Sequence, residues 1–230
     1  MIVTVHSFKG GTGKTFIALN LAYMLSRSNK VCLIDFDFRA PSLYLFFGRG
    51  NARYINELLD GSAKLEDCLI RVSENLSVML ASPKLEDIRK DLRRDDREEM
   101  RILERLIALK SELNDFDYVI VDTSPGLSYR SINALLISDL ILLVVRADRL
   151  DLNGLKTLLE VIKEIKTPKF VVLNRVVRDV ELDLNVPIAA KIPCSCDVSM
   201  DHPFFVERFP QHNVTRGIEE LVKFIANRQF

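Results

Sequence analysis

A glycine-rich stretch near the start of the chain, HSFKGGTGKT at residues 6–15, constrains the fold more than any other feature. It follows a short apolar run and precedes a helical pattern that begins near Thr15. A strand, a glycine-rich loop and a helix in this order are the context that a phosphate-binding loop requires. Phe8 stands where the usual G-x-x-x-x-G-K-[ST] pattern has its first glycine. The alternative is a glycine-rich turn that happens to precede a helix. The other positions would then agree with the phosphate-loop pattern only by chance.

Each position of this loop has an expected role in holding a nucleotide. The glycines let the backbone approach phosphate oxygens, and the N–H groups at the helix start supply donors and positive potential. Lys14 adds a full charge at the β- and γ-phosphates, and Thr15 offers a hydroxyl to Mg²⁺. Lys9 is a second cation, and two cations this close repel unless an anion neutralises both. The expected contacts to the nucleotide from this loop are Gly10, Gly11, Thr12, Gly13, Lys14, Thr15 and Phe16.

Short apolar runs alternate with longer helical patterns along the whole chain, which is typical of parallel βαβ units. Several runs are apolar at nearly every position, as expected for strands covered on both faces. We therefore predict one α/β domain over residues 1–230, with a mostly parallel sheet flanked by helices on both faces. The predicted strands are IVTVHS, VCLID, LSVMLAS, YVIVD, LILLVV, FVVLN and PIAAKI, and the predicted helices are 15–26, one long helix within 85–113, 128–137, 150–165 and 215–226.

Composition excludes several classes of protein. The 32 basic and 32 acidic side chains cancel, so no global field draws the chain to nucleic acid or anionic lipid. The four cysteines are too few and too scattered for a disulfide scaffold, and no secretion signal or membrane-spanning run is seen, so we expect a cytoplasmic protein. The segment 89–101 carries six basic and five acidic side chains, which favours a solvated helix face over a nucleic-acid patch.

Carboxylates end two of the predicted strands. Asp122 in YVIVDTSPG can hold Mg²⁺, and Gly126 follows where a backbone N–H could contact the γ-phosphate. Asp35 and Asp37 in VCLIDFDFRAPS alternate, so they point the same way if the strand continues. One of them can lie near the metal while the other meets the attacking water. For Asp37 the alternative is a carboxylate at a helix N-terminus or in a turn, before Ala40-Pro41-Ser42.

The loop KGGTGKT, the segment DFDFRAPS and the segment VIVDTSPGLS together resemble the deviant Walker A ATPases of the ParA/MinD group, most of all the MinD-like branch. The resemblance covers nearly the whole chain and implies the P-loop NTPase fold. It implies that Lys9 reaches the ATP phosphates of a partner subunit in a nucleotide-sandwich dimer. Lys9, Lys14 and Asp37 are then the catalytic residues, with Asp37 orienting water, while Thr15, Asp35 and Asp122 support Mg²⁺.

The resemblance also indicates where the adenine would lie. Asn174, at the end of FVVLNR, could pair with the base edge, and the backbone after Pro193 in IPCSCD would face the base. Arg175 could contact ATP. A buried asparagine bonded to backbone at a strand end is the alternative for Asn174.

The function implied is a Mg²⁺-dependent ATP hydrolase that forms a homodimer on binding ATP and resets by slow hydrolysis. It would act as a spatial-positioning or partitioning switch, with an activating partner protein. A metal or iron–sulfur cluster carrier using the same dimer is the alternative, since Cys194, Cys196 and His202 invite a metal. A ligase-like enzyme acting on a small molecule is a third possibility.

The sequence leaves two possible binding surfaces for the protein, DNA and a membrane. DNA binding is possible, although the neutral charge balance argues against it. Membrane binding through the tail GIEELVKFIANRQF is not favoured, because its apolar stripe fits a last helix packed on the core. The arginines considered for DNA are Arg146, Arg149, Arg175 and Arg178, and the stripe is Ile218, Leu221, Val222 and Ile225.

Overall fold

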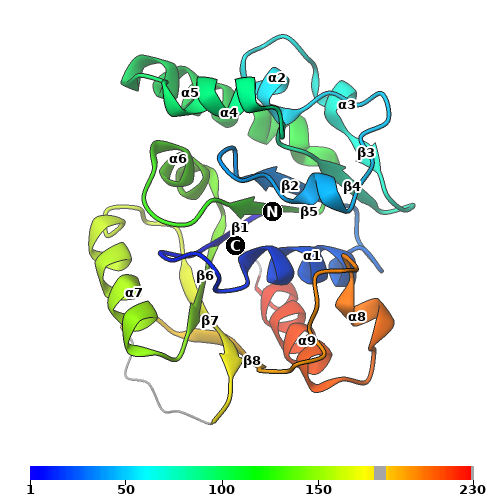
Figure 1. The fold of residues 1–230 in the computed structure, drawn as a ribbon, viewed down its shortest axis with the longest axis vertical. Coiled ribbons are helices and arrows are strands. Elements are labelled where there is room, and N and C mark those ends of the chain that lie inside the picture. Colours follow the sequence, from blue (N-terminus) through cyan, green and yellow to red (C-terminus); the bar gives the residue numbers. More distant parts are fainter. Residues whose placement is uncertain (179–184, 229–230) are drawn as a thin grey trace.

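The computed structural model describes residues 1–178 and 185–228. It contains one eight-stranded sheet in the order β3-β4-β2-β5-β1-β6-β7-β8, in which only the short edge strand β3 runs antiparallel to its neighbour (Figure 1). The predicted mostly parallel sheet is therefore confirmed. The strands are β1 (Ile2–His6), β2 (Val31–Phe36), β3 (Ile70–Arg71), β4 (Leu76–Met79), β5 (Tyr118–Thr123), β6 (Leu140–Arg146), β7 (Lys169–Val176) and β8 (Ile188–Pro193).

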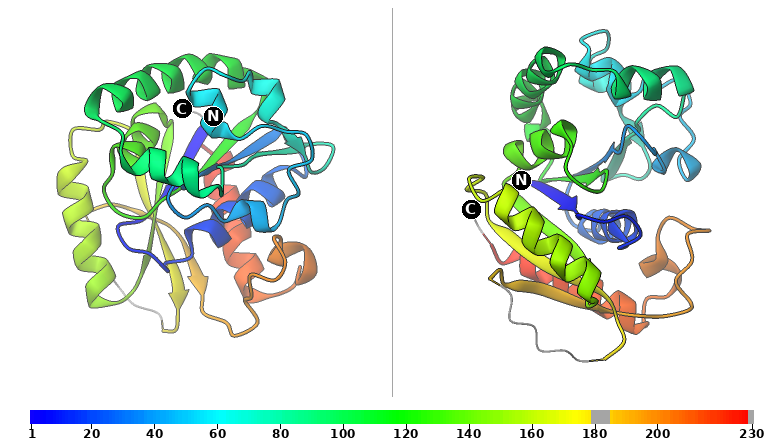
Figure 2. Two further views of the ribbon diagram at one scale, coloured as in Figure 1. Left: turned by 45° about the horizontal axis from the view of Figure 1, so that its top comes forward. Right: turned by 60° about the vertical axis from the view of Figure 1, so that its left-hand side comes forward.

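Helices cover both faces of the sheet, as Figure 2 shows from two sides. One face packs against α1, α8 and α9, and the other against α2, α5, α6 and α7. The inner strands are buried on both faces, which explains why their sequences are continuous apolar runs. The helices are α1 (Lys14–Leu25), α2 (Ile55–Leu59), α3 (Leu65–Cys68), α4 (Leu85–Leu92), α5 (Asp96–Glu112), α6 (Tyr129–Ile137), α7 (Arg149–Val161), α8 (Phe205–Arg208) and α9 (Asn213–Ala226).

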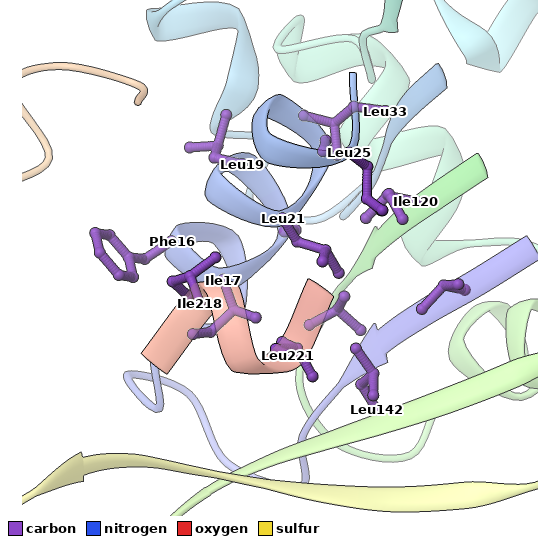
Figure 3. Close-up of a cluster of buried hydrophobic side chains, with 14 of the residues drawn as sticks. Phe16, Ile17, Leu19, Leu21, Leu25, Leu33, Ile120, Leu142, Ile218 and Leu221 are labelled. Atoms are coloured by element: carbon purple, nitrogen blue, oxygen red, sulfur yellow. The ribbon is translucent and has the colours of Figure 1, made fainter. Parts of the chain in front are cut away.

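The largest core cluster joins α1 to the sheet and to α9. Ile17 and Leu21 of α1 lie beside Ile218 and Leu221 of α9, above Leu142 of β6 (Figure 3). All five side chains are fully buried. This packing fixes the direction of α1, and with it the loop that precedes the helix.

The last helix is a core helix, as predicted. Ile218, Leu221 and Ile225 are fully buried, and α9 packs on β8 and α1. Within the described residues, no helix is both long enough and apolar enough to span a membrane.

The long helix predicted within residues 85–113 is α5, and a shorter helix that the sequence did not indicate, α4, precedes it. The structure has α4 and α5, separated by a break at 93–95. Asp95 begins α5 as its N-cap, because its side chain accepts a hydrogen bond from Glu98 N at 2.9 Å, while the Glu98 side chain bonds back to Asp95 N. This reciprocal capping box is a strong helix start, so the chain turns there instead of continuing.

The solvated helix face predicted at 89–101 is wrong for three of its residues, although an ion pair within the segment, as predicted with it, is present. Asp91 and Glu99 are buried, and the side chain of Arg94 is only 8% exposed. They form ion pairs beneath the surface with Arg130 from α6 or with one another.

Candidate active site

The glycine-rich loop connects β1 to α1 and curls around the amino end of that helix. Gly11 and Gly13 adopt left-handed φ angles of 75° and 94°, which side chains disfavour. Gly13 has a second reason to lack a side chain, since a Cβ there would lie 2.2 Å from Asn174 Nδ2. The loop therefore leaves its N–H groups at a helix start with no bulk in front of them, as an anion site requires.

Lys14 is the buried cation of this loop. Its residue is 7% exposed, and burial lowers its pKa, while the nearby charges of Asp122 and Asp37 oppose that shift. A further anion, such as the phosphates of a nucleotide, would stabilise the charged form of a lysine buried in this way.

Asp122 and Asp35 face one another on the neighbouring strands β5 and β2. Burial raises the pKa of Asp122 to about 7, and a hydrogen bond with the Thr15 side chain and the charge of Lys14 work against that rise. Asp122 Oδ1 is buried without a hydrogen-bond partner among the described residues. A free carboxylate oxygen beside a threonine hydroxyl fits a Mg²⁺ ion, which takes oxygen ligands.

Both carboxylate oxygens of Asp35 accept hydrogen bonds from backbone N–H groups, in contrast to Asp122. Oδ1 accepts a hydrogen bond from Asp37 N at 3.1 Å, and Oδ2 accepts from Ser42 N and Leu43 N at 3.2 and 3.1 Å. Burial and the charge of Asp122 raise its pKa to about 8 in spite of these bonds. Asp35 thus anchors the loop that follows β2, and its part in Mg²⁺ binding stays a prediction.

Asp37 lies in that loop as a turn carboxylate, which is the alternative that its sequence left open. Its Oδ1 accepts hydrogen bonds from Arg39 N at 3.2 Å and Ala40 N at 3.0 Å. Its charge also acts on Lys14 and Asp122, so the carboxylate lies within electrostatic reach of the phosphate loop. The turn fixes the carboxylate there, and its role toward water stays a prediction.

Gly126 has a left-handed φ of 82°, and its N–H donates to Ser7 O at 2.9 Å. Contact of this N–H with a γ-phosphate would require that bond to be exchanged. The loop after β5 is therefore connected directly to the phosphate loop through its backbone.

Lys9 occupies a different environment from Lys14. It is half-buried and makes no ion pair within the described part of the chain. The pKa of Asp151 in α7 is held below its usual range first by a hydrogen bond from Arg146 and, as the smallest cause, by the charge of Lys9. Lys9 is thus a cation near α7 with no ion-pair partner among residues 1–178 and 185–228.

The packing of Phe8 explains how the loop tolerates an aromatic residue in place of glycine. Phe8 lies against Gly154 in α7, where a Cβ would come within 2.6 Å of Phe8 Cδ1 and 3.2 Å of Cγ. The missing side chain at Gly154 leaves the space that the ring occupies. Phe8 therefore fixes the first half of the loop, including Lys9, against α7.

This packing predicts an unusual effect of Gly154→Ala. Alanine in a helix interior is normally more stable than glycine by about 1 kcal/mol. We expect Gly154→Ala to lower the free energy of unfolding instead, and to raise it in a Phe8→Ala background. Urea unfolding of the four proteins measures this. A stabilised Gly154→Ala single variant would show that Phe8 is not seated on Gly154.

A cavity of about 430 Å³ opens beside the phosphate loop. Its walls bring together the loop and the three residues predicted for the base side, Asn174, Arg175 and Pro193. Sequence reasoning did not identify the apolar part of the lining, because its residues come from the end of β8, from the segment after it and from α9. That part consists of Ile192, Val198, Met200 and Val214.

Asn174 both lines the cavity and supports the loop. Its Nδ2 donates to Thr12 O at 2.7 Å, and the residue is 5% exposed. The amide nitrogen is thus bonded to backbone, as the alternative interpretation has it. Contact of Asn174 with a base stays a prediction.

Arg175 follows with a φ of 55°, a left-handed conformation that is uncommon outside glycine. It lies at the irregular end of the β7–β8 pairing and lines both this cavity and a neighbouring one with Arg146 and Arg178. Arg146 is engaged by Asp151 and Asp148, so the charge of this one arginine is already paired.

Cys194 and Cys196 are exposed free thiols at the rim of the cavity and beyond it. Within residues 1–178 and 185–228, no group of three or more metal-ligating side chains gathers at one point. His202 is not brought to the two thiols as a third ligand.

His6 lies at the carboxyl end of β1, directly before the loop, and is fully buried. Its Nδ1 lies 2.8 Å from Thr123 Oγ1, which itself donates to Val5 O. Nδ1 therefore donates to Thr123. Burial and the charge of Lys14 lower the pKa of His6 to about 3.

This shift predicts how acid destabilises the protein. Below the ordinary pKa of 6.5, the unfolded chain binds a proton at His6 that the folded protein refuses until about pH 3. His6 should therefore contribute a fall in the free energy of unfolding as the pH drops across this window, opposite in sign to the contributions of Asp35 and Asp122, and this fall should be absent in His6→Gln. Chemical denaturation at several pH values tests this, with exposed His202→Gln as the control. Equal slopes for parent and His6→Gln would refute it.

Comparison with known proteins agrees with this site. Residues 1–175 match the family model described as AAA domain. An uncharacterized ATP-binding protein of Methanocaldococcus jannaschii is 33% identical over 182 residues, covering 78% of this chain and 66% of that protein. A putative septum site-determining protein MinD of Guillardia theta is 30% identical over 209 residues, covering 84% of this chain and 74% of that protein. The chain thus spans about two thirds to three quarters of these relatives.

A solved structure has the same fold. The septum site-determining protein MinD complexed with Mg-ADP, from Pyrococcus horikoshii, superposes with a TM-score of 0.81 at 24% identity, over 98% of this chain and 96% of that one.

A parallel sheet, a glycine-rich loop at a helix start and a buried lysine with a carboxylate opposite define a P-loop nucleoside triphosphatase. The chain belongs to the AAA domain family of P-loop proteins, among the ATP-hydrolysing members of the MinD/ParA type.

Proposed function

We propose that the chain binds Mg-ATP in the cavity beside the phosphate loop, forms a homodimer around two nucleotides, and resets by slow hydrolysis. The observation that carries this proposal is the pair of lysines. Buried Lys14 already supplies the charge for a bound phosphate in its own chain, whereas Lys9 has no ion-pair partner among the described residues. A cation such as Lys9 is suited to contact the phosphates of a facing subunit, as a finger supplied in trans.

Mg²⁺ would lie between Thr15 and Asp122, with Asp35 behind them. Bound there, it would neutralise charge on the β- and γ-phosphates. Asp122 would keep an oxygen directed at the metal, Lys14 would hold the phosphates, and Asp37 would orient the attacking water. Asn174, Arg175 and the backbone after Pro193 would enclose the base.

The cellular role proposed is a spatial-positioning or partitioning switch in the cytoplasm. Relatives are described as a septum site-determining protein MinD and a chromosome partitioning protein ParA, and the four cysteines are free thiols. An activating partner protein would accelerate the slow hydrolysis. DNA is a possible working surface through Arg175 and Arg178, and a membrane is less favoured, since α9 is engaged in the core.

Variants in the phosphate loop test nucleotide binding. Lys14→Ala should weaken ATP binding about tenfold to a hundredfold, because it removes a buried charge that faces the phosphates. Thr15→Ala should lose only the Mg²⁺-dependent part of the affinity. Titration calorimetry with and without Mg²⁺ measures both effects. Parent affinity in Lys14→Ala would place the phosphate site elsewhere.

A further inference from the structure

Four charged side chains lie buried together where α4, α5 and α6 meet. We call this group, Asp91, Arg94, Glu99 and Arg130, the Arg130 cluster. Arg130 Nη2 lies 3.0 Å from Asp91 Oδ1, and its Nε donates to Glu99 Oε1 at 3.2 Å. Arg94 Nε lies 3.8 Å from Asp91 Oδ1. None of the four side chains is more than 9% exposed.

In the loop that follows β2, the ring of Phe38 is covered by the face of the Arg130 guanidinium. Arg130 Cζ lies 4.4 Å from the centre of the Phe38 ring. Phe38 is 3% exposed and packs edge-on against Phe36, with 4.9 Å between ring centres. A guanidinium can offer its edge to carboxylates and its face to a ring at the same time, which a lysine cannot do. Arg130 therefore has a fixed position between α4, α5 and the loop.

Phe38 directly follows Asp37, the carboxylate assigned to the attacking water. The loop is held by Asp35 through Asp37 N, Ser42 N and Leu43 N, and by Arg130 through the Phe38 ring. Arg130 itself lies in the first turn of α6, just after the loop that contains Gly126. The loop after β2 and the start of α6 thus meet at one side chain.

Stability alone gives little reason for such a cluster. Burial of charge is costly, and buried ion pairs are often no better than apolar residues of the same size. Several atoms of the cluster, among them Arg130 Nη1 and Glu99 Oε2, lack hydrogen-bond partners in the described chain. A role in orientation accounts for the cluster better than a role in stability.

We propose that Arg130 is a positioning residue for Asp37. It holds Phe38 against the start of α6, so that the turn containing Asp37 and the loop containing Gly126 are displaced together or not at all. The proposal rests on the proposed function, in which Asp37 orients water, but its structural part can be measured without hydrolysis.

Hydrogen exchange of single amides, followed by NMR on nucleotide-free protein, tests the structural part. The amides of Arg39 and Ala40 donate to Asp37 Oδ1 and so report on that carboxylate, whereas those of Ser42 and Leu43 report on Asp35. In Arg130→Met the first pair should exchange about tenfold or more faster, because a desolvated cation–π contact is lost. The amides of Ser42 and Leu43 should keep their exchange rates. A general loss of stability would instead accelerate exchange at both pairs of amides.

Kinetics test the catalytic part. In Arg130→Met, kcat should fall about tenfold or more while the affinity for ATP is unchanged, because the cluster does not line the nucleotide cavity. Arg105→Met is the matched control, an arginine of α5 that bonds Glu112 and Leu58 O away from both loops. It should leave exchange and kcat unchanged.

Two further variants apply if Arg130→Met fails to fold with its carboxylates unpaired. A triple variant, Arg130→Met with Asp91→Asn and Glu99→Gln, removes the buried charges together. Phe38→Leu leaves the charges in place and removes only the ring. Both should reproduce the fast exchange at Arg39 and Ala40, and Phe38→Leu combined with Arg130→Met should be no worse than the more severe single variant.

The proposal is overturned by unchanged exchange at Arg39 and Ala40 in a folded Arg130 variant, or by effects of Arg130→Met and Phe38→Leu that simply add. It is also overturned if kcat falls only in proportion to ATP affinity. A parent protein that does not hydrolyse ATP would instead refute the proposed function, and the exchange rates would still decide whether Arg130 holds the Asp37 turn.

Discussion

Lys9→Ala is expected to abolish ATP hydrolysis while leaving ATP binding to the single chain nearly intact. The loop from Gly10 to Thr15 and the carboxylate of Asp122 remain in place, so the monomer keeps its contacts to the nucleotide. Two triphosphates buried face to face concentrate like charge in a poorly screened interface, and only cations near both can offset it. The variant should therefore fail to dimerise, and hydrolysis should fall about a thousandfold, as on loss of a finger supplied in trans.

Light scattering with ATP and a phosphate-release assay measure the two effects of Lys9→Ala, and calorimetry measures its ATP affinity. Lys163→Ala serves as the control, because Lys163 is an exposed lysine just after α7 that pairs with the exposed Glu160. A Lys9→Ala protein that dimerises and hydrolyses ATP like the parent would show that Lys9 does not act on the phosphates of a facing subunit.

Asp37→Ala is expected to bind ATP nearly as well as the parent and to accumulate as an ATP dimer. Its carboxylate is assigned to water and not to the phosphates, so hydrolysis should fall about a hundredfold or more. Because Asp37 also accepts hydrogen bonds from Arg39 N and Ala40 N, Asp37→Asn is the necessary control. The amide keeps an acceptor for the turn but lacks the charge, and it too should be inactive.

Size-exclusion chromatography with ATP detects the accumulated dimer, and single-turnover assays measure hydrolysis. If Asp37→Asn hydrolyses ATP at the parent rate while Asp37→Ala does not, then Asp37 acts through the turn and its role toward water is wrong.

The fold could be predicted from sequence because its signals are local. Each inner strand is an apolar run whose length fits a strand. The glycine-rich loop between a strand and a helix indicates at which edge of the sheet the parallel strands end. Asp35, Asp122 and Asn174 could be placed at one edge of the sheet because parallel strands end at the same edge. The two polar residues on the base side of the cavity, Asn174 and Arg175, were predicted through the family resemblance.

Contacts between distant segments could not be predicted. Nothing near Arg130 in the sequence indicates that Asp91 and Glu99 reach it, and mixed charges at 89–101 favour a solvated helix face on composition alone. The seating of Phe8 on Gly154 likewise depends on where α7 lies. The break before α5 did have a local signal, since Asp95 and Glu98 have the spacing of a capping box.

The central claim, that each chain completes the site of its partner, is tested most directly by mixing Lys9→Ala with Asp37→Ala and measuring ATP hydrolysis. If Lys9 acts in trans, one site of the mixed dimer carries both defects and the other is whole, so activity should return in the mixture although each variant alone is inactive. If Lys9 acts in its own chain, each site carries one defect. A mixture that light scattering shows to be dimeric and that still fails to hydrolyse ATP would contradict the claim.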